Sequence, residues 1–272
     1  MTRASVLGLG LIGGSAALSL GARGWDRDPQ ARRDAAKRGI DVADTLEAAV
    51  AEAEIVIVAV PTASAPALLA EAAAARPGAI FSDTASLKRG ILRAAQALPA
   101  GLRFVGGHPM AGSRTPGLAG ADAALFQGRP WILVPAAGGR ESDLAAVRAL
   151  VSSVGAVPIV LDAALHDAAM TRISHLPHAV SSALAAAVAR STAADLGRLA
   201  GPGLLDATRL ADAPIALQLE LALADPPALA DALDDVVQEI GALAEALRRE
   251  DAEAVNAFFE RGRAARRRIA PS

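Results

Sequence analysis

The sequence predicts an α/β protein: a Rossmann-type doubly wound parallel sheet followed by an all-helical domain. Three observations support this prediction. A glycine-rich loop, Gly8-Leu9-Gly10-Leu11-Ile12-Gly13-Gly14, joins a short apolar strand to a helix. Segments with strand and helix character then alternate as far as residue 161. From Asp162 onward the pattern is helical throughout, so we expect one domain over residues 1–161 and a second over 162–272.

The elements of the first half follow from local composition. Residues 4–7 are apolar and run into the glycine loop, after which 15–20 continue as a helix. Residues 55–60 form a continuous apolar run, which is typical of a strand buried on both faces, and Pro61 ends it. The same reasoning predicts a short strand at 24–25, strands at 79–83, 104–106, 131–134 and 157–161, and helices at 65–75 and 87–97.

Two long helices are expected near the carboxyl end. Pro226-Pro227 opens the first, and Asp251 caps the second. The second helix ends in Arg266-Arg267-Arg268, whose positive charge suits the negative end of the helix dipole. We interpret this basic end as a solvated helix terminus. The first helix carries an apolar stripe at steps of three and four residues: Leu229, Leu233, Val236, Ile240, Leu243 and Leu247. Such a stripe is more often core than an oligomer seam, but in so small a helical domain we expect a homodimer interface.

Composition excludes several classes of protein. Hydrophobic residues make up 53% of the 272 residues, yet no apolar run reaches the roughly 20 residues of a membrane span. The first apolar stretch starts too close to Met1 for a signal peptide. The chain has no cysteine, which excludes disulfides and thiolate chemistry, and its net charge of −2 gives no electrostatic case for nucleic acid. We therefore expect a cytoplasmic protein that binds neither membranes nor nucleic acid.

The glycine loop points to a dinucleotide. Gly8, Gly10 and Gly13 form the pattern G-x-G-x-x-G between a strand and a helix, where glycine permits a tight turn and a close approach of the backbone to a pyrophosphate. The helix N-terminus then faces the phosphates. The alternative is a turn in which glycine merely permits tight packing.

Asp26 indicates which dinucleotide is bound. It follows the first glycine at close to the roughly 20 positions expected for the acid that binds the ribose. Its carboxylate would accept hydrogen bonds from both ribose hydroxyls and repel a 2′-phosphate, which favours NAD over NADP. Arg27 follows directly and could bind a 2′-phosphate, so NADP stays open as the alternative.

Histidine is the natural proton acceptor in this chain. There is no tyrosine and no cysteine, so a group that titrates near neutral pH is one of His108, His166, His175 and His178. We place His108 on a glycine-rich turn. His175 and His178 share one helical face, but without a carboxylate cluster beside them we expect no metal. His166 would lie about 180° around a continuous helix from His175, and we leave it out of the site.

Two classes of nicotinamide enzyme fit poorly. The absence of tyrosine excludes the tyrosine–lysine pair of short-chain dehydrogenases. The absence of lysine from the second half counts against the lysine-dependent 3-hydroxyacid dehydrogenases. The remaining possibility is a nicotinamide-dependent enzyme that uses a histidine as its acid or base.

Several motifs, taken together, carry a family resemblance. They are Gly8-Leu9-Gly10-Leu11-Ile12-Gly13-Gly14-Ser15, Ala59-Val60-Pro61, Asp83-Thr84-Ala85-Ser86-Leu87-Lys88, Gly107-His108-Pro109-Met110-Ala111-Gly112-Ser113, His166-Asp167, Ser174-His175-Leu176-Pro177-His178 and residues 201–209. Over nearly its whole length the chain thereby resembles the prephenate/arogenate dehydrogenase family. We expect neither a regulatory amino-acid-binding domain after its last residue nor a chorismate mutase before its first strand.

The resemblance implies an activity and a set of residues. The family oxidises a cyclohexadienol with loss of carbon dioxide, so that prephenate gives 4-hydroxyphenylpyruvate and arogenate gives tyrosine, within tyrosine biosynthesis. It implies His108 as the base for the ring hydroxyl, Ser86 as a second partner of that hydroxyl, and Arg209 as the ligand of a substrate carboxylate. It further implies four residues that bind the substrate: His175, His178, Ser113 and Arg114. The residues that it implies for NAD binding are the loop glycines, Asp26, Leu11, Ile12, Val60 and Pro61.

Other interpretations stay open for individual residues. Ser86 could cap the helix at 87–97, and Arg209 could pair with Asp206 or Asp212 on the surface. Arg114 departs from the family, which often has glutamate or another polar residue at this position. A second cation there would favour the keto-acid side chain of prephenate over the ammonium of arogenate. The competing functions are another two-domain nicotinamide reductase and an NAD-binding module without catalysis.

Overall fold

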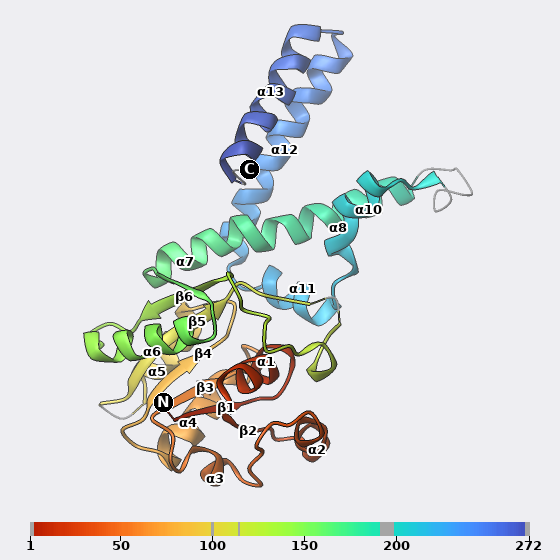
Figure 1. Ribbon diagram of the computed structural model, residues 1–272. Helices are drawn as coiled ribbons and strands as arrows, with labels where there is room; N and C mark the ends of the chain where they lie inside the picture. Colours follow the sequence, from red (N-terminus) through yellow and green to blue (C-terminus); the bar gives the residue numbers. More distant parts are fainter. Residues whose placement is uncertain (1–2, 99–100, 114, 191–198, 270–272) are drawn as a thin grey trace. The chain divides into compact units, whose positions relative to one another are not determined.

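The computed structural model describes residues 3–98, 101–113, 115–190 and 199–269 (Figure 1). The chain forms two compact units, Met1–Asp167 and Ala168–Ser272. We call them the sheet unit and the helical unit, and each is described by itself. The α/β class with a sheet followed by helices is confirmed.

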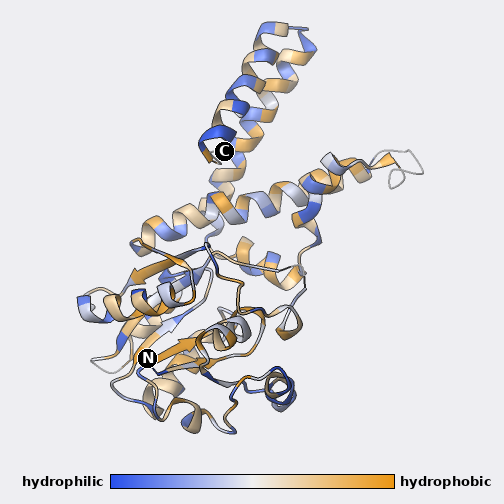
Figure 2. Ribbon diagram, in the orientation of Figure 1, coloured by the Kyte–Doolittle hydropathy of each residue, from blue (hydrophilic) through white to orange (hydrophobic). Residues whose placement is uncertain are grey.

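The sheet unit contains seven strands in the order β2-β1-β3-β4-β5-β6-β7. Their bounds are β1 (Ala4–Leu7), β2 (Arg23–Trp25), β3 (Ile55–Val58), β4 (Ile80–Asp83), β5 (Arg103–Pro109), β6 (Pro130–Pro135) and β7 (Val157–Val160). The pairs from β2 to β5 are parallel, with Val6 opposite Ile57 in the centre. All four residues of β3 are buried, as its β-branched run predicts, and the central strands carry hydrophobic colours in Figure 2.

Strand β6 departs from the expected parallel order, because it pairs antiparallel with β5. Among its described residues, the segment between these strands contains the 3₁₀ turn η1 (Leu118–Gly120) and no crossover helix. A parallel neighbour needs a crossover that carries the chain back to the starting edge, usually a helix. Here the chain re-enters the sheet at the edge where β5 ends, so β6 runs in the direction opposite to β5. Strand β7 is again parallel to β6.

Helices cover both faces of the sheet. Side chains of α1 (Leu11–Leu20), α2 (Pro29–Lys37) and α6 (Glu141–Ser153) share one hydrophobic core. Helices α3 (Leu46–Val50), α4 (Ala65–Ala75) and α5 (Arg89–Gln96) pack against one another. The sequence patterns did not predict α2, α3 and α6.

The helical unit follows α7 (Ala163–Met170), which spans the boundary. Its elements are the π-helical turn η2 (Thr171–His175), α8 (Leu176–Ala189), α10 (Pro202–Thr208), the 3₁₀ turn η3 (Arg209–Asp212), α11 (Ile215–Ala222), α12 (Pro226–Arg248) and α13 (Ala252–Ile269). Both long helices are confirmed, and the Asp251 carboxylate accepts from the Ala254 amide at 3.0 Å as the predicted cap.

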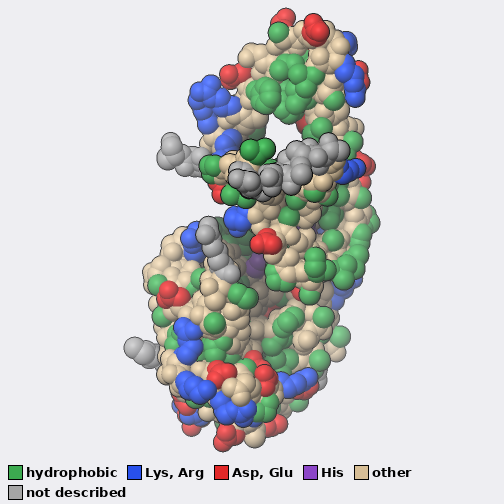
Figure 3. Space-filling model, turned by 90° about the vertical axis from the view of Figure 1, so that its right-hand side faces the viewer, with side chains coloured by type: hydrophobic (Ala, Val, Ile, Leu, Met, Phe, Trp, Pro, Cys, Tyr) green, Lys and Arg blue, Asp and Glu red, His purple; other side chains and the backbone are tan. Residues whose placement is uncertain are grey.

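Much of the helical unit's apolar surface is exposed. Leu229 of the predicted stripe is buried, whereas Ile240 and Leu247 are 57% and 56% exposed. Hydrophobic side chains lie on the surface of the α12–α13 hairpin in Figure 3. Within the described ranges, no helix combines the length and apolar composition that a bilayer crossing requires.

Candidate active site

The three glycines of the predicted nucleotide loop have different surroundings. A Cβ at Gly8, whose φ is +98°, would collide with the carbonyl oxygen of Ala59, and a Cβ at Gly13 would collide with that of Gly8. A Cβ at Gly10 would meet no atom within 4 Å. The chain's own packing therefore requires Gly8 and Gly13, while Gly10 leaves open space for a close ligand.

The surroundings of this loop fit a pyrophosphate. Helix α1 begins at Leu11, directly after Gly10, and its first turn contains no acidic side chain. The first amide groups of a helix lack partners within it and bind anions, which gives Leu11 and Ile12 their predicted role. Val60 and Pro61 follow β3 at the same edge of the sheet, and Val60 lies beside Gly8.

Asp26 lies where strand β2 meets the glycine loop. Its Oδ2 accepts a hydrogen bond from the Leu9 amide at 2.8 Å, and its Oδ1 accepts from the Asp28 amide at 2.9 Å. Arg27 instead forms an exposed ion pair with Glu71 at 3.1 Å. The cation that could have attracted a 2′-phosphate thus already has a carboxylate partner.

His108 lies within strand β5, opposite Ile132 of β6, and the expected glycine-rich turn at this position is wrong. The glycines before it allow close packing instead of a turn. A Cβ at Gly107 would collide with the carbonyl oxygen of Asp83, and one at Gly106 would lie 3.1 Å from Cδ of Lys88. The strand can continue to His108 because both positions lack a side chain.

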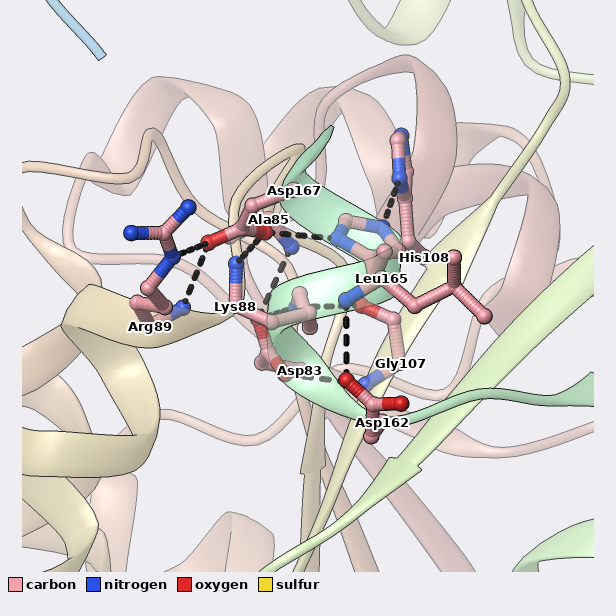
Figure 4. Close-up of polar contacts among 10 residues, drawn as sticks. Asp83, Ala85, Lys88, Arg89, Gly107, His108, Asp162, Leu165 and Asp167 are labelled. Atoms are coloured by element: carbon pink, nitrogen blue, oxygen red, sulfur yellow. Dashed lines mark hydrogen bonds and ion pairs between the residues drawn. The ribbon is translucent and has the colours of Figure 1, made fainter. Parts of the chain in front are cut away.

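A buried ion pair holds the peptide group before His108 (Figure 4). Lys88 Nζ donates to Asp83 Oδ2 at 2.5 Å and to the Gly107 carbonyl oxygen at 2.6 Å. Asp83 Oδ1 accepts from the Gly107 amide at 3.0 Å, and neither charged side chain is exposed. Burial lowers the pKa of Lys88, and the Asp83 carboxylate opposes this effect. We call Asp83, Lys88 and Gly107 the buried clamp.

A second hydrogen-bonded chain reaches the imidazole of His108. His108 Nδ1 lies 2.9 Å from His166 Nε2, and His166 Nδ1 lies 2.7 Å from Asp167 Oδ1. His166 is fully buried. We call His108, His166 and Asp167 the histidine relay (Figure 4).

Asp167 also organises the start of helix α5. Its Oδ1 accepts from the Lys88 amide at 2.9 Å, and its Oδ2 from the Arg89 amide at 3.0 Å. Burial alone would raise the pKa of Asp167, but the hydrogen bonds from His166 and from these two amides hold the pKa below its ordinary value. Helix α5 begins at Arg89, so the alternative of Ser86 as its cap is wrong. Ser86 lies half-buried on the connection between β4 and α5.

The sequence places His166 outside the site, because one continuous α-helix would turn it about 180° away from His175. The helix is not continuous: residues Thr171–His175 form a π-helical turn. Pro177 explains this turn, because it has no amide hydrogen for the Ile173 carbonyl and its ring crowds that group. The available signal is the pair His166-Asp167, in the helix that follows the last strand. The clamp residues Asp83 and Lys88 belong to the family motif at residues 83–88, but the sequence alone assigns them no role.

The helical unit brings two predicted substrate residues together. Burial lowers the pKa of His178, a hydrogen bond with the Leu210 backbone opposes this, and the nearby Arg209 guanidinium lowers the pKa further. Ser181 of α8 braces the Arg209 turn, since its hydroxyl donates to the Ala207 carbonyl and accepts from the Ala211 amide. Arg209 is exposed and has no carboxylate partner among the described residues, contrary to the surface-pair alternative.

The other predicted substrate residues are more scattered. His175 is buried at the end of η2. Ser113 is exposed and accepts from the Thr115 amide at 3.2 Å, and Arg114 lies outside the described residues. In the part of the chain that the structure describes, no three histidine or carboxylate side chains group as metal ligands would.

Family models and sequence relatives point to one family. Residues 20–160 match the model of the prephenate dehydrogenase nucleotide-binding domain, and 162–261 match that of its dimerization domain. The chain is 32% identical to a prephenate dehydrogenase of Lactococcus lactis subsp. cremoris, over 97% of this chain and 76% of the relative.

Solved structures show the same relationship. The prephenate dehydrogenase from A. aeolicus in complex with hydroxyphenyl propionate and NAD⁺ is 26% identical, with a TM-score of 0.89 over 99% of both chains. A Synechocystis arogenate dehydrogenase is 28% identical, with a TM-score of 0.86 over 99% of this chain and 100% of that one. These matches confirm the resemblance that the motifs carry, and the chain belongs to the prephenate dehydrogenase family.

Proposed function

We propose that this dehydrogenase catalyses the NAD-dependent oxidative decarboxylation of prephenate to 4-hydroxyphenylpyruvate in tyrosine biosynthesis. The observation that carries the proposal is the placement of His108. Its imidazole stands near the end of β5 in a nucleotide-binding domain, and a buried histidine and carboxylate hold it there. A general base needs this combination of a near-neutral side chain and a fixed orientation.

The residues divide the reaction between them. His108 accepts the proton of the ring hydroxyl as the carbon that bears it is oxidised, and Ser86 donates or accepts a hydrogen bond at the same hydroxyl. NAD⁺, when bound, supplies the acceptor for the hydride. Loss of carbon dioxide then aromatises the ring and makes the reaction irreversible. The nucleotide would be held by Gly8, Gly10, Leu11, Ile12, Gly13, Asp26, Val60 and Pro61.

A side-by-side assay tests this function. Purified protein is mixed with NAD⁺ and either prephenate or arogenate, and NADH absorbance is followed. We expect a larger kcat/KM for prephenate, because Arg114 would add a cation that repels the ammonium of arogenate. Higher kcat/KM for arogenate would contradict the substrate assignment and leave the dehydrogenase reaction standing.

Arg209→Ala is expected to raise KM for prephenate about tenfold or more, since a charge-assisted hydrogen bond to a carboxylate contributes about 1.5–3 kcal/mol. Arg209 suits this role because it is exposed beside His178, whose pKa burial and the Arg209 guanidinium both lower. Steady-state kinetics at saturating NAD⁺ measure the effect. The affinity for NAD⁺ should stay unchanged, and Arg190→Ala, directly after α8, provides a control for the loss of an arginine. An unchanged KM in Arg209→Ala would remove Arg209 from the substrate site.

Asp26→Ala is expected to narrow the preference for NAD⁺ over NADP⁺, because it removes the charge that repels a 2′-phosphate. The Arg27–Glu71 pair supports the wild-type preference for NAD⁺. The ratio of kcat/KM for NAD⁺ to kcat/KM for NADP⁺ measures this preference in the wild type and in the variant. A wild-type preference for NADP⁺ would show that Arg27 dominates over Asp26.

We also propose that the protein is a homodimer through its helical unit. The unit matches a family dimerization domain, and its described residues leave Val237, Ile240, Leu247 and Phe259 more than half exposed on the α12–α13 hairpin. Apolar surface of this kind is stabilised by burial against a second copy. Sedimentation of the full chain tests the proposal, and a monomer at micromolar concentration would contradict it.

A further inference from the structure

We propose that His166 and Asp167 are positioning residues that fix the tautomer of His108, so that its Nε2 is the atom that receives the substrate proton. The inference deepens the proposed function and rests on it. Neither residue needs to touch substrate. Their effect passes through the hydrogen bonds of the histidine relay.

The proton positions follow from the groups involved. An ionised carboxylate can only accept, so Nδ1 of His166 carries a hydrogen and donates it to Asp167 over 2.7 Å. The pKa of Asp167 below its ordinary value keeps this carboxylate ionised at neutral pH. A neutral His166 therefore has its lone pair on Nε2. Across the 2.9 Å contact this lone pair accepts from His108, which must donate from Nδ1.

The consequence for His108 is a defined base. With its hydrogen on Nδ1, the neutral ring carries its lone pair on Nε2, on the side away from His166. The opposite tautomer would place a hydrogen on Nε2, and the ring could no longer accept a proton there. Fixing the tautomer through a buried partner is the role that a carboxylate plays behind a catalytic or metal-bound histidine.

The surroundings make the relay rigid. The Asp162 carboxylate caps helix α7 through the Leu165 amide at 2.8 Å, which fixes the turn that bears His166. The Lys88 and Arg89 amides and the Arg89 side chain bind Asp167. Among the described residues, Asp167 thus bonds the His166 ring directly, while Lys88 and Arg89 bond the Asp167 carboxylate. The Asp167 carboxylate thus links the start of α5 to the His166 ring, and His166 in turn contacts the imidazole of His108.

Nitrogen NMR of the wild-type protein tests the tautomers directly. The chain has four histidines, so single variants assign every imidazole after ¹⁵N labelling. At neutral pH, without substrate or nucleotide, we expect both His108 and His166 to be protonated on Nδ1 and unprotonated on Nε2. A doubly protonated His166, or a His108 with its hydrogen on Nε2, would overturn the proposal.

Two variants separate the two hydrogen bonds. The His166→Asn amide can still donate to Asp167 but does not reach His108, and we expect kcat to fall about 10- to 100-fold with little change in KM. The longer His166→Gln side chain can offer its amide oxygen to His108 Nδ1 and should recover part of the loss. Equal loss in both variants, or His108 still wholly in the Nδ1–H form in His166→Asn, would assign His166 a purely structural role.

The experiment keeps the two proposals apart. The NMR measurement needs no turnover, so the expected tautomers without prephenate oxidation would reject the function and support the relay. Prephenate oxidation with the opposite tautomer would reject the relay and support the function. Thermal unfolding of each variant identifies any loss of kcat that reflects loss of folded protein.

Discussion

His108→Asn is expected to lower kcat for prephenate by about 10² or more, because the reaction loses its general base. Asparagine places an amide nitrogen where Nδ1 stands, so the hydrogen bond to His166 can persist. The substitution removes Nε2, the ring nitrogen on the side away from His166. Stopped-flow or steady-state measurement of NADH formation gives the effect.

The control for this variant is nucleotide binding. Gly8, Gly10 and Asp26 lie on other segments of the sheet unit, so the dissociation constant for NAD⁺ should remain within about twofold of wild type if only the base is lost. Near-full kcat at neutral pH in His108→Asn would reject the assignment of the base. Loss of NAD⁺ affinity together with kcat would indicate a disrupted sheet edge instead.

Lys88→Met is expected to destabilise the protein by about 3–5 kcal/mol, since removal of one partner from a buried ion pair leaves the other charge uncompensated. Methionine retains most of the side-chain length while it removes the bonds to Asp83 and to the Gly107 carbonyl. Urea unfolding measures the change in the free energy of unfolding. Activity should fall as well, because the clamp holds the residue before His108.

The chain offers a matched control, because it has one other lysine. Lys37 is mostly exposed and pairs with Asp34 on the surface of α2. Lys37→Met should leave the free energy of unfolding within error of wild type, as exposed pairs contribute little. The double variant Asp83→Asn/Lys88→Met should be more stable than Lys88→Met alone. If the double variant were less stable, an uncompensated charge would not be the reason for the loss.

Local patterns predicted the parts of the fold that depend on local chemistry. The buried run of β3, the glycine loop and the two long helices all carry their own signals, and the structure contains them close to the expected bounds. The antiparallel β6 carries no such signal, because its direction depends on how the preceding loop returns to the sheet. Short helices such as α3 were missed because five residues do not establish a period.

The candidate site divides in the same way. Residues that belong to a motif, such as His108 and Asp26, could be named from the sequence. His166 could not, because its contact with His108 joins positions 58 residues apart in the chain, and no local pattern shows that pairing. The sequence predicts a turn at Gly107, because it shows the freedom of a glycine but not the Asp83 backbone that excludes every larger residue there.

The nucleotide loop shows that identical residues can be retained for different reasons. Substitution at Gly8 or Gly13 disturbs the folded chain itself, so selection for a stable protein suffices to keep them. A methyl group at Gly10 disturbs nothing in the chain and obstructs only a close ligand. A descendant that abandoned dinucleotide chemistry while keeping the fold would be released from constraint at residue 10 first. In this loop, residue 10 is therefore the position at which a substitution would report loss of nucleotide binding separately from loss of the fold.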